Sequence, residues 1–182
     1  MDYREIIKES SVVYEGSIIK VTSHKVKCPN GIDAHREIVH HPGGVGVVPV
    51  DCDGFVYMVR QYRIPYDAMM LEIPAGKLDK NENPDIAALR ELREETGLVA
   101  GKLEFMGHFY PSVGFCNEDL RMYLATDLIQ GETDPDEDEF VQVEKIHIDQ
   151  VVNDIMNNKI SDGKTIAAIL KAKQMLKERW FL

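Results

Sequence analysis

The chain has 182 residues, 44% of them apolar and 29% charged, a balance typical of a globular protein that buries a core. A formal net charge of −10 disfavours nucleic-acid binding, because there is no basic surplus to neutralise phosphates. Cys28, Cys52 and Cys116 are too widely separated for a CxxC zinc motif or a disulfide framework. No segment approaches the about 20 apolar residues of a membrane helix, and residues 1–14 lack the apolar stretch of a signal peptide. We therefore expect a cytoplasmic protein with no nucleic-acid or membrane partner.

The first 41 residues predict a small antiparallel sheet. β-prone runs occur at residues 11–14, 18–26 and 37–40. Cys28-Pro29-Asn30-Gly31 separates the last two runs, and Asn-Gly is a strong hairpin signal. Pro42-Gly43-Gly44 then interrupts the pattern. We predict an N-terminal module at residues 1–41 and a main domain at residues 42–182.

The main domain mixes strands and helices without a regular repeat. Strand candidates lie at residues 45–50, 55–60, 69–73, 102–110, 119–126 and 141–148. A helix should begin after Asn83, a good N-cap followed by Pro84, and end at Gly97. Two more helices are predicted at residues 148–157 and 162–179. This order predicts an α/β fold built in layers.

The chemically informative segment runs from Gly76 to Leu98. Its pattern is Gly-x5-Glu-x7-Arg-Glu-Leu-x-Glu-Glu-x-Gly-Leu. At about 100° per residue, its glutamates at positions 91, 94 and 95 fall within about a 100° arc of one helix. Leu89 and Leu92 are expected to point the other way, toward a core.

Carboxylates crowded on one helical face repel one another unless a cation lies among them. Mg²⁺ and Mn²⁺ are suitable cations, because both prefer carboxylate oxygens. Arg90 lies one turn before Glu94 and beside Glu91, where it can hold a carboxylate by a bidentate contact. Such an acidic run alone would suit a solvated helix face. The full spacing from Gly76 to Leu98 instead favours a metal site.

This segment resembles the Nudix box at every fixed position. The resemblance implies an α/β/α sandwich with a mixed sheet, and hydrolysis of a nucleoside diphosphate linked to another group. It implies that the metal ligands are Glu91, Glu94 and Glu95, with Arg90 orienting them. Gly76, Glu82 and Gly97 would support the box. Mg²⁺, or Mn²⁺ in its place, would neutralise the diphosphate and lower the pKa of the attacking water.

The segments flanking the box resemble the ADP-ribose pyrophosphatase branch, from about residue 36 to 173. The similar stretches are Arg60-Gln61-Tyr62-Arg63, residues 71–76, residues 110–118 and the end of an acidic loop, Asp136-Glu137-Asp138-Glu139-Phe140. By this resemblance the Ala75 carbonyl is a further metal ligand and Glu72 lies near the site. Arg63 would contact the substrate, at its terminal ribose or at a phosphate.

Further substrate contacts implied by the same resemblance are Arg36, Glu118 and Pro111. Pro111 occupies the downstream proline position associated with ADP-ribose specificity. Val113 departs from the branch, which usually has a second proline in a Pro-Ser-Pro-Gly sequence. A valine can also be extended but is less rigid than proline.

Residues 134–139 hold five acids in six positions. They form either a solvated loop or the source of the general base, which must reach the attacking water. For the second case we favour Glu139, with Glu137 as the next candidate.

The N-terminal sheet of this branch serves dimerisation, often by exchange between protomers, so we predict a homodimer. The leading predicted reaction is Mg²⁺-dependent hydrolysis of ADP-ribose to AMP and ribose 5-phosphate. One alternative is a Nudix hydrolase of another nucleoside diphosphate sugar, such as GDP-mannose. A more distant alternative is a non-catalytic nucleotide-binding regulator, which the complete set of box carboxylates disfavours.

Overall fold

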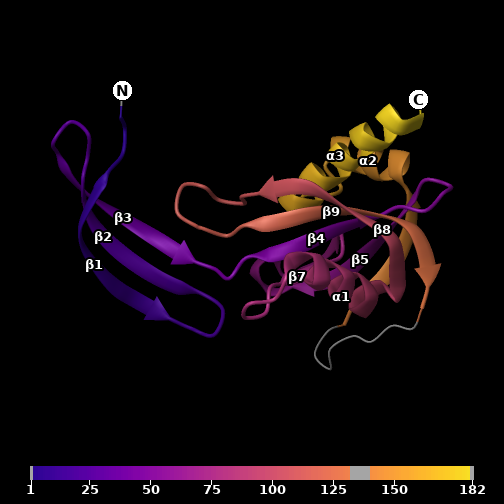
Figure 1. Ribbon diagram of the computed structural model, residues 1–182, viewed down its shortest axis with the longest axis horizontal. Coiled ribbons are helices and arrows are strands. Elements are labelled where there is room, and N and C mark those ends of the chain that lie inside the picture. The colour runs from indigo at the N-terminus through magenta and orange to yellow at the C-terminus, as the bar shows by residue number, and fades with distance from the viewer. Residues whose placement is uncertain (1, 132–139, 181–182) are drawn as a thin grey trace. The chain divides into compact units, whose positions relative to one another are not determined.

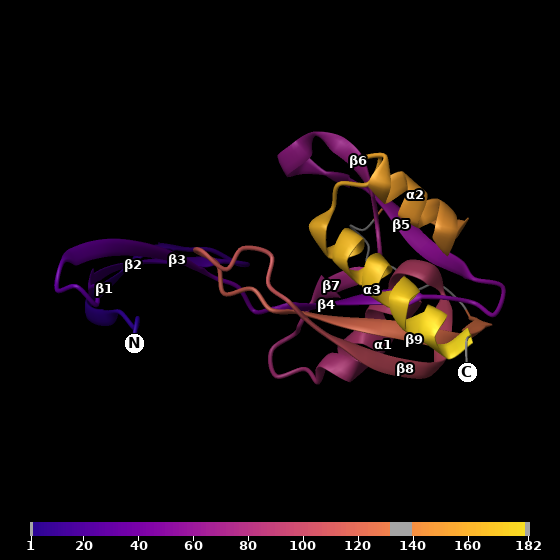
Figure 2. The same cartoon turned by 90° about the horizontal axis from the view of Figure 1, so that it is seen from above.

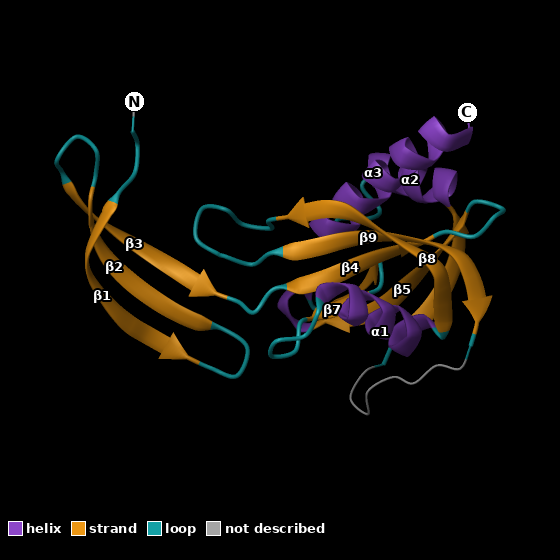
Figure 3. Ribbon diagram, viewed as in Figure 1, coloured by secondary structure: helices purple, strands orange, loops and turns teal. Residues whose placement is uncertain are grey.

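The computed structural model describes residues 2–131 and 140–180 (Figure 1). The chain divides into two compact units. The small unit comprises Met1–Gly43 and Tyr110–Asp119, and the large unit comprises Gly44–Phe109 and Leu120–Leu182. Among its described residues the small unit has strands and loops but no helix (Figure 3).

The small unit contains the antiparallel sheet predicted for the N-terminus. Strands β1 (Ile6–Glu15), β2 (Lys20–Lys27) and β3 (Asp33–His40) lie in the order β1-β2-β3. Gly31 closes the turn between β2 and β3 with a φ of +86°, a conformation that glycine adopts readily. Residues 110–119 join this unit through Val39, whose N–H donates to the Phe115 carbonyl at 2.7 Å. The Val39 carbonyl in turn accepts from the N–H of Asn117 at 3.1 Å.

The large unit is built around a mixed sheet. This sheet has the order β7 (Ala75–Lys77), β4 (Gly44–Pro49), β9 (Leu120–Gln130) and β8 (Leu98–Phe109). The pair β4 and β9 is parallel, and the other pairs are antiparallel. A second sheet has the order β10 (Gln142–His147), β5 (Phe55–Arg63) and β6 (Ala68–Glu72). A short 3-10 turn, η1 (Ile64–Tyr66), connects β5 to β6.

Helices cover both faces of the mixed sheet. Alternate residues of β4 face opposite layers, as the strand period requires. Val45 and Val47 pack in a cluster with α1 (Pro84–Thr96), whereas Val48 packs in a cluster with α2 (Ile148–Met156) and α3 (Gly163–Trp180). Figures 1 and 2 show α1 on one side of β4 and β9 and the other two helices on the opposite side. The predicted α/β sandwich with a mixed sheet is therefore confirmed. No helix in the described ranges is long and apolar enough to cross a membrane.

Both ends of α1 are set by local signals. The Asn83 side chain accepts hydrogen bonds from the N–H groups of Asp85 at 2.8 Å and Ile86 at 3.4 Å. Gly97 ends the helix in the left-handed conformation, with a φ of +72°, and its N–H donates to the Arg93 carbonyl at 2.7 Å. The helix bounds predicted from the sequence are thus confirmed.

Replacing Asn83 by alanine is expected to lower the free energy of unfolding by about 1 kcal/mol, because two N–H groups lose their acceptor. Urea unfolding followed by circular dichroism measures the change. Asn83→Ser is the matched control, since serine also caps helices and should retain most of the stability. Equal stability of the wild type and the alanine variant would show that this cap contributes nothing.

Candidate active site

The acidic face of α1 lies partly against the sheet. Glu91 and Glu95 are buried, with exposed fractions of 6% and 3%, and Glu94 is half-buried. The prediction that Leu89 points to the core is wrong, because its side chain is exposed, whereas Leu92 is buried as predicted. Leu92 and Glu95 lie only about 60° apart around the helix axis, so the core-facing arc includes carboxylates and excludes Leu89.

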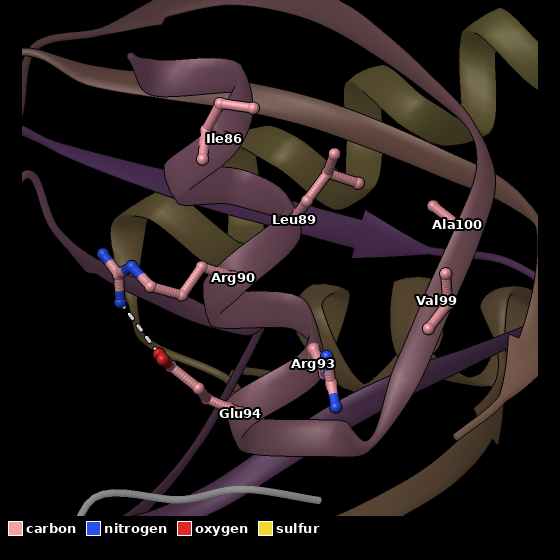
Figure 4. Close-up of a pocket in the computed structure, with 7 residues that line it drawn as sticks. All are labelled: Ile86, Leu89, Arg90, Arg93, Glu94, Val99 and Ala100. Atoms are coloured by element: carbon pink, nitrogen blue, oxygen red, sulfur yellow. Dashed lines mark hydrogen bonds and ion pairs between the residues drawn. The ribbon is translucent and has the colours of Figure 1, made fainter. Parts of the chain in front are cut away.

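Arg90 is the positive centre of this acidic face. Its Nε and Nη2 donate to the two oxygens of Glu82 at 2.9 and 3.0 Å. Its Nη1 donates to Glu91 at 2.9 Å and to Glu94 at 2.8 Å, the latter contact drawn in Figure 4. The hydrogen bonds to Glu82 contribute most to raising the pKa of Arg90 above its ordinary value. One guanidinium group, that of Arg90, therefore binds three carboxylates.

Glu82 connects the loop before α1 to the helix. Its Oε2 accepts the N–H of Asp79 at 3.0 Å, in addition to the two hydrogen bonds from Arg90. These hydrogen bonds, with those of Arg90 first, hold the pKa of Glu82 below its ordinary value. The carboxylate consequently stays charged near neutral pH and keeps the loop fastened to Arg90.

Strand β7 lies close against the acidic face. The N–H of Ala75 donates to Glu95 Oε2 at 3.0 Å. At Gly76, a β-carbon would lie only 2.0 Å from Glu91 Oε1, so no larger residue fits while that carboxylate keeps its position. The glycine of the motif is thus required for the close approach of β7 to Glu91.

The potential metal ligands in this cluster are carboxylate oxygens, which suit a hard divalent cation. The missing side chain of Gly76 supports this fit, because it leaves room for the Glu91 carboxylate beside the backbone of Ala75–Lys77. Within residues 2–131 and 140–180, however, no three acidic, histidine or cysteine side chains converge in a way that would hold a metal ion. In this structure the guanidinium of Arg90 lies among Glu82, Glu91 and Glu94 instead.

Arg63 and Glu72 form a second polar cluster in the large unit. Arg63 donates through Nε and Nη2 to both oxygens of Glu72, at 2.7 and 2.8 Å. Glu72 is 2% exposed, and Lys164 also donates to its Oε2. Burial raises the pKa of Glu72, but hydrogen bonds and charges from Arg63 and Lys164 outweigh it, so the pKa lies below its ordinary value. Sequence reasoning missed Lys164, because 92 positions separate it from Glu72 and no local pattern links them.

The other predicted site residues lie either in the small unit or outside the described residues. Arg36, Pro111 and Glu118 belong to the small unit. Arg36 donates through Nε to Glu5 at 3.0 Å, Pro111 is exposed, and Glu118 Oε1 lies 3.5 Å from Nδ1 of His41. Glu137 and Glu139, the candidates for the general base, lie outside the described residues.

A pocket of about 420 Å³ adjoins the outer side of α1 (Figure 4). Its lining includes Leu89, the leucine wrongly predicted to be in the core, together with Ile86 and Val99. Arg90 and Glu94 line it as well, so it borders the acidic face. The sequence pattern did not predict this pocket.

Comparison with known proteins identifies relatives along almost the whole chain. Residues 40–169 match the family described as NUDIX domain. An ADP-ribose pyrophosphatase of Bacillus subtilis (strain 168) is 39% identical over 180 residues, covering 97% of this chain and 96% of the relative. A methanol dehydrogenase activator of Bacillus methanolicus is 37% identical over 181 residues, covering 97% of this chain and 98% of the relative. The crystal structure of an ADP compounds hydrolase shares the fold, with a TM-score of 0.85, 21% identity and coverage of 97% and 96%.

Proposed function

The chain belongs to the NUDIX domain family, and from this premise we propose that it hydrolyses ADP-ribose to AMP and ribose 5-phosphate. The observation that carries the proposal is the cluster of Glu82, Glu91 and Glu94 around Arg90, in a chain with the complete box. The 39% identity to an ADP-ribose pyrophosphatase over 97% of this chain supports the choice of substrate.

Hydrolases of this family depend on a divalent metal, and we propose Mg²⁺, with Mn²⁺ as a substitute. Glu91, Glu94, Glu95 and the Ala75 carbonyl would hold the ion. When bound, the ion supplies positive charge that offsets the diphosphate and acidifies the attacking water.

The residues of the chain supply the other parts of the reaction. Arg90 keeps the box carboxylates oriented through the contacts described above. Arg63 binds an anionic oxygen or the terminal ribose of the substrate, and Glu72 lies next to it. Glu139, or Glu137, accepts the proton of the water that attacks one phosphorus. The bridging P–O bond then breaks, and the other phosphate leaves with its sugar.

We propose that residues 1–41 form a dimerisation module, residues 42–182 the hydrolase domain, and that the enzyme is a homodimer. Every residue of β1 is exposed, and strongly exposed apolar side chains there include Ile6 and Val13. An edge strand of this kind favours pairing with another chain. Exchange of this module would let Arg36 serve the partner's site. We also propose a cytoplasmic location, which the three free cysteines favour.

Light scattering after size exclusion measures the mass of the particle in solution. The expected mass is twice that of the 20.7 kDa chain. A particle of 20.7 kDa at micromolar concentration would rule out the homodimer.

The substrate proposal is tested by a product assay. Purified protein with Mg²⁺ is offered ADP-ribose, GDP-mannose, ADP-glucose, NADH and diadenosine polyphosphates in parallel. Release of AMP and ribose 5-phosphate, fastest from ADP-ribose, is the expected result. Faster hydrolysis of another compound, such as GDP-mannose, would reassign the substrate. Absence of hydrolysis with retained nucleotide binding would make the chain a binding protein.

A further inference from the structure

A lysine at the start of α3 enters the polar cluster of Arg63 and Glu72. Lys164 Nζ donates to Glu72 Oε2 and, at 2.9 Å, to Oδ2 of Asp162. Only 13% of the lysine side chain is exposed. A nearly buried ammonium ion is costly unless its partners are well placed, and here it bridges two carboxylates. This lysine is therefore held in one position.

Glu72 connects this lysine to Arg63. Its side chain is 3% exposed, and Oε2 accepts from both cations. The ion pair uses Nε and Nη2 of Arg63, which leaves Nη1 for another acceptor. Hydrogen bonds to Glu72 come first among the causes that raise the pKa of Arg63, and the charges of Glu95 and Asp162 also raise it. The guanidinium thus lies within electrostatic reach of the acidic face of α1.

The start of α3 is itself fastened to the strand that leads into the box. Asp162 accepts the N–H of Thr165 at 3.1 Å and its hydroxyl at 2.6 Å, as a helix N-cap does. The same hydroxyl oxygen accepts the N–H of Ile73 at 2.9 Å, and Thr165 is fully buried. Ile73 directly follows Glu72, so the backbone of Lys164 is fixed relative to the carboxylate that it contacts.

We propose that Lys164 is a positioning residue for the reaction, which holds Glu72 so that Glu72 aims the Arg63 guanidinium at the substrate. The proposal rests on the proposed function, in which Arg63 meets the substrate. Loss of Lys164 would remove the ammonium ion that bridges Glu72 and Asp162, so the two carboxylates would repel each other and Glu72 would be held less firmly. Arg63 would then sample more orientations and bind substrate more weakly.

Steady-state kinetics with ADP-ribose provides the first test. Lys164→Met is expected to raise KM about tenfold and to change kcat less than about twofold, because Arg63 binds substrate and transition state alike. Lys164→Arg should restore most of the affinity by returning a cation. Lys173→Met is the matched control, because it removes another lysine–carboxylate pair, with Asp149, from the same helix and should leave KM unchanged. Lys164→Gln replaces the methionine variant if that variant does not fold.

A double-mutant cycle separates positioning from a general structural role. In an Arg63→Ala background, Lys164→Met should raise KM no further, because the group that it positions is absent. If the two substitutions raise KM by independent factors, or if Lys164→Met leaves KM unchanged, Lys164 does not act through Arg63.

A measurement without substrate distinguishes failure of this proposal from failure of the proposed function. The ¹⁵N resonance of Arg63 Nε, assigned by its loss in Arg63→Lys, reports the hydrogen bond to Glu72 directly. It should shift or broaden in Lys164→Met and stay in place in Lys173→Met. An unchanged resonance in both variants overturns the positioning role. A wild type that fails to hydrolyse ADP-ribose would overturn the assigned substrate and leave the NMR result to decide on Lys164.

Discussion

Replacing Glu94 by glutamine is expected to lower kcat by about 100-fold or more, because one carboxylate of the proposed metal site loses its charge. The fold should remain, since the amide oxygen of glutamine can still accept the hydrogen bond that Arg90 Nη1 donates at 2.8 Å. Glutamine also has nearly the same volume as glutamate, so the change opens no cavity. Initial rates at saturating Mg²⁺ measure the loss of turnover, and thermal unfolding measures the stability.

Glu178→Gln is the matched control for this substitution, because it also neutralises a helical glutamate, on α3 and outside the acidic face. It should keep wild-type turnover. A Glu94→Gln enzyme that retains more than about a tenth of wild-type activity would place the metal elsewhere. Glu95→Gln should lower kcat similarly, and its fold should also remain, since the amide oxygen of glutamine can still accept the N–H of Ala75.

Gly76→Ala is expected to abolish most turnover through one added methyl group. The new β-carbon would lie 2.0 Å from Glu91 Oε1, so the carboxylate must leave its position. The φ of Gly76 is not positive, and the backbone itself therefore tolerates alanine. We expect kcat to fall by about 100-fold, with a loss of about 1–3 kcal/mol in the free energy of unfolding from overpacking.

The effect of Gly76→Ala is measured by the same initial rates and by urea unfolding. Gly114→Ala is its control, because no atom outside the adjacent residues lies within 4 Å of the β-carbon that would be added there. That variant should behave like the wild type. Full activity of Gly76→Ala would mean that the position of Glu91 in this structure is unimportant for metal binding.

Local signals explain why α1 could be predicted from the sequence to the residue. Asn83 and Gly97 act on the groups nearest to them in the chain, so their effect does not depend on the rest of the fold. The alternation of β4 likewise follows from the strand period. The small N-terminal sheet was also predictable from a local signal, because Asn30-Gly31 favours a hairpin turn.

Tertiary packing determines two features that could not be predicted from the sequence, namely the exposure of Leu89 and the contact of Lys164 with Glu72. Leu89 is apolar and on a helix, but the sheet contacts the arc that contains Ala88 and Leu92. Periodicity shows that a face is apolar without showing how the next layer is oriented. The contact of Lys164 with Glu72 likewise depends on where α3 begins relative to β6. Its only local hint is Asp162, which marks a helix start.

The discontinuity of the small unit has a consequence for the order of folding during synthesis. Strands β1 to β3 can pair as a meander once Met1–Gly43 has emerged from the ribosome. The Val39 backbone, however, finds Phe115 and Asn117 only after about 70 more residues have been made, because Tyr110–Asp119 completes the unit. At about 5–20 residues per second, the edge of β3 waits several seconds for these partners. A nascent chain would therefore carry an unpaired strand edge during that interval.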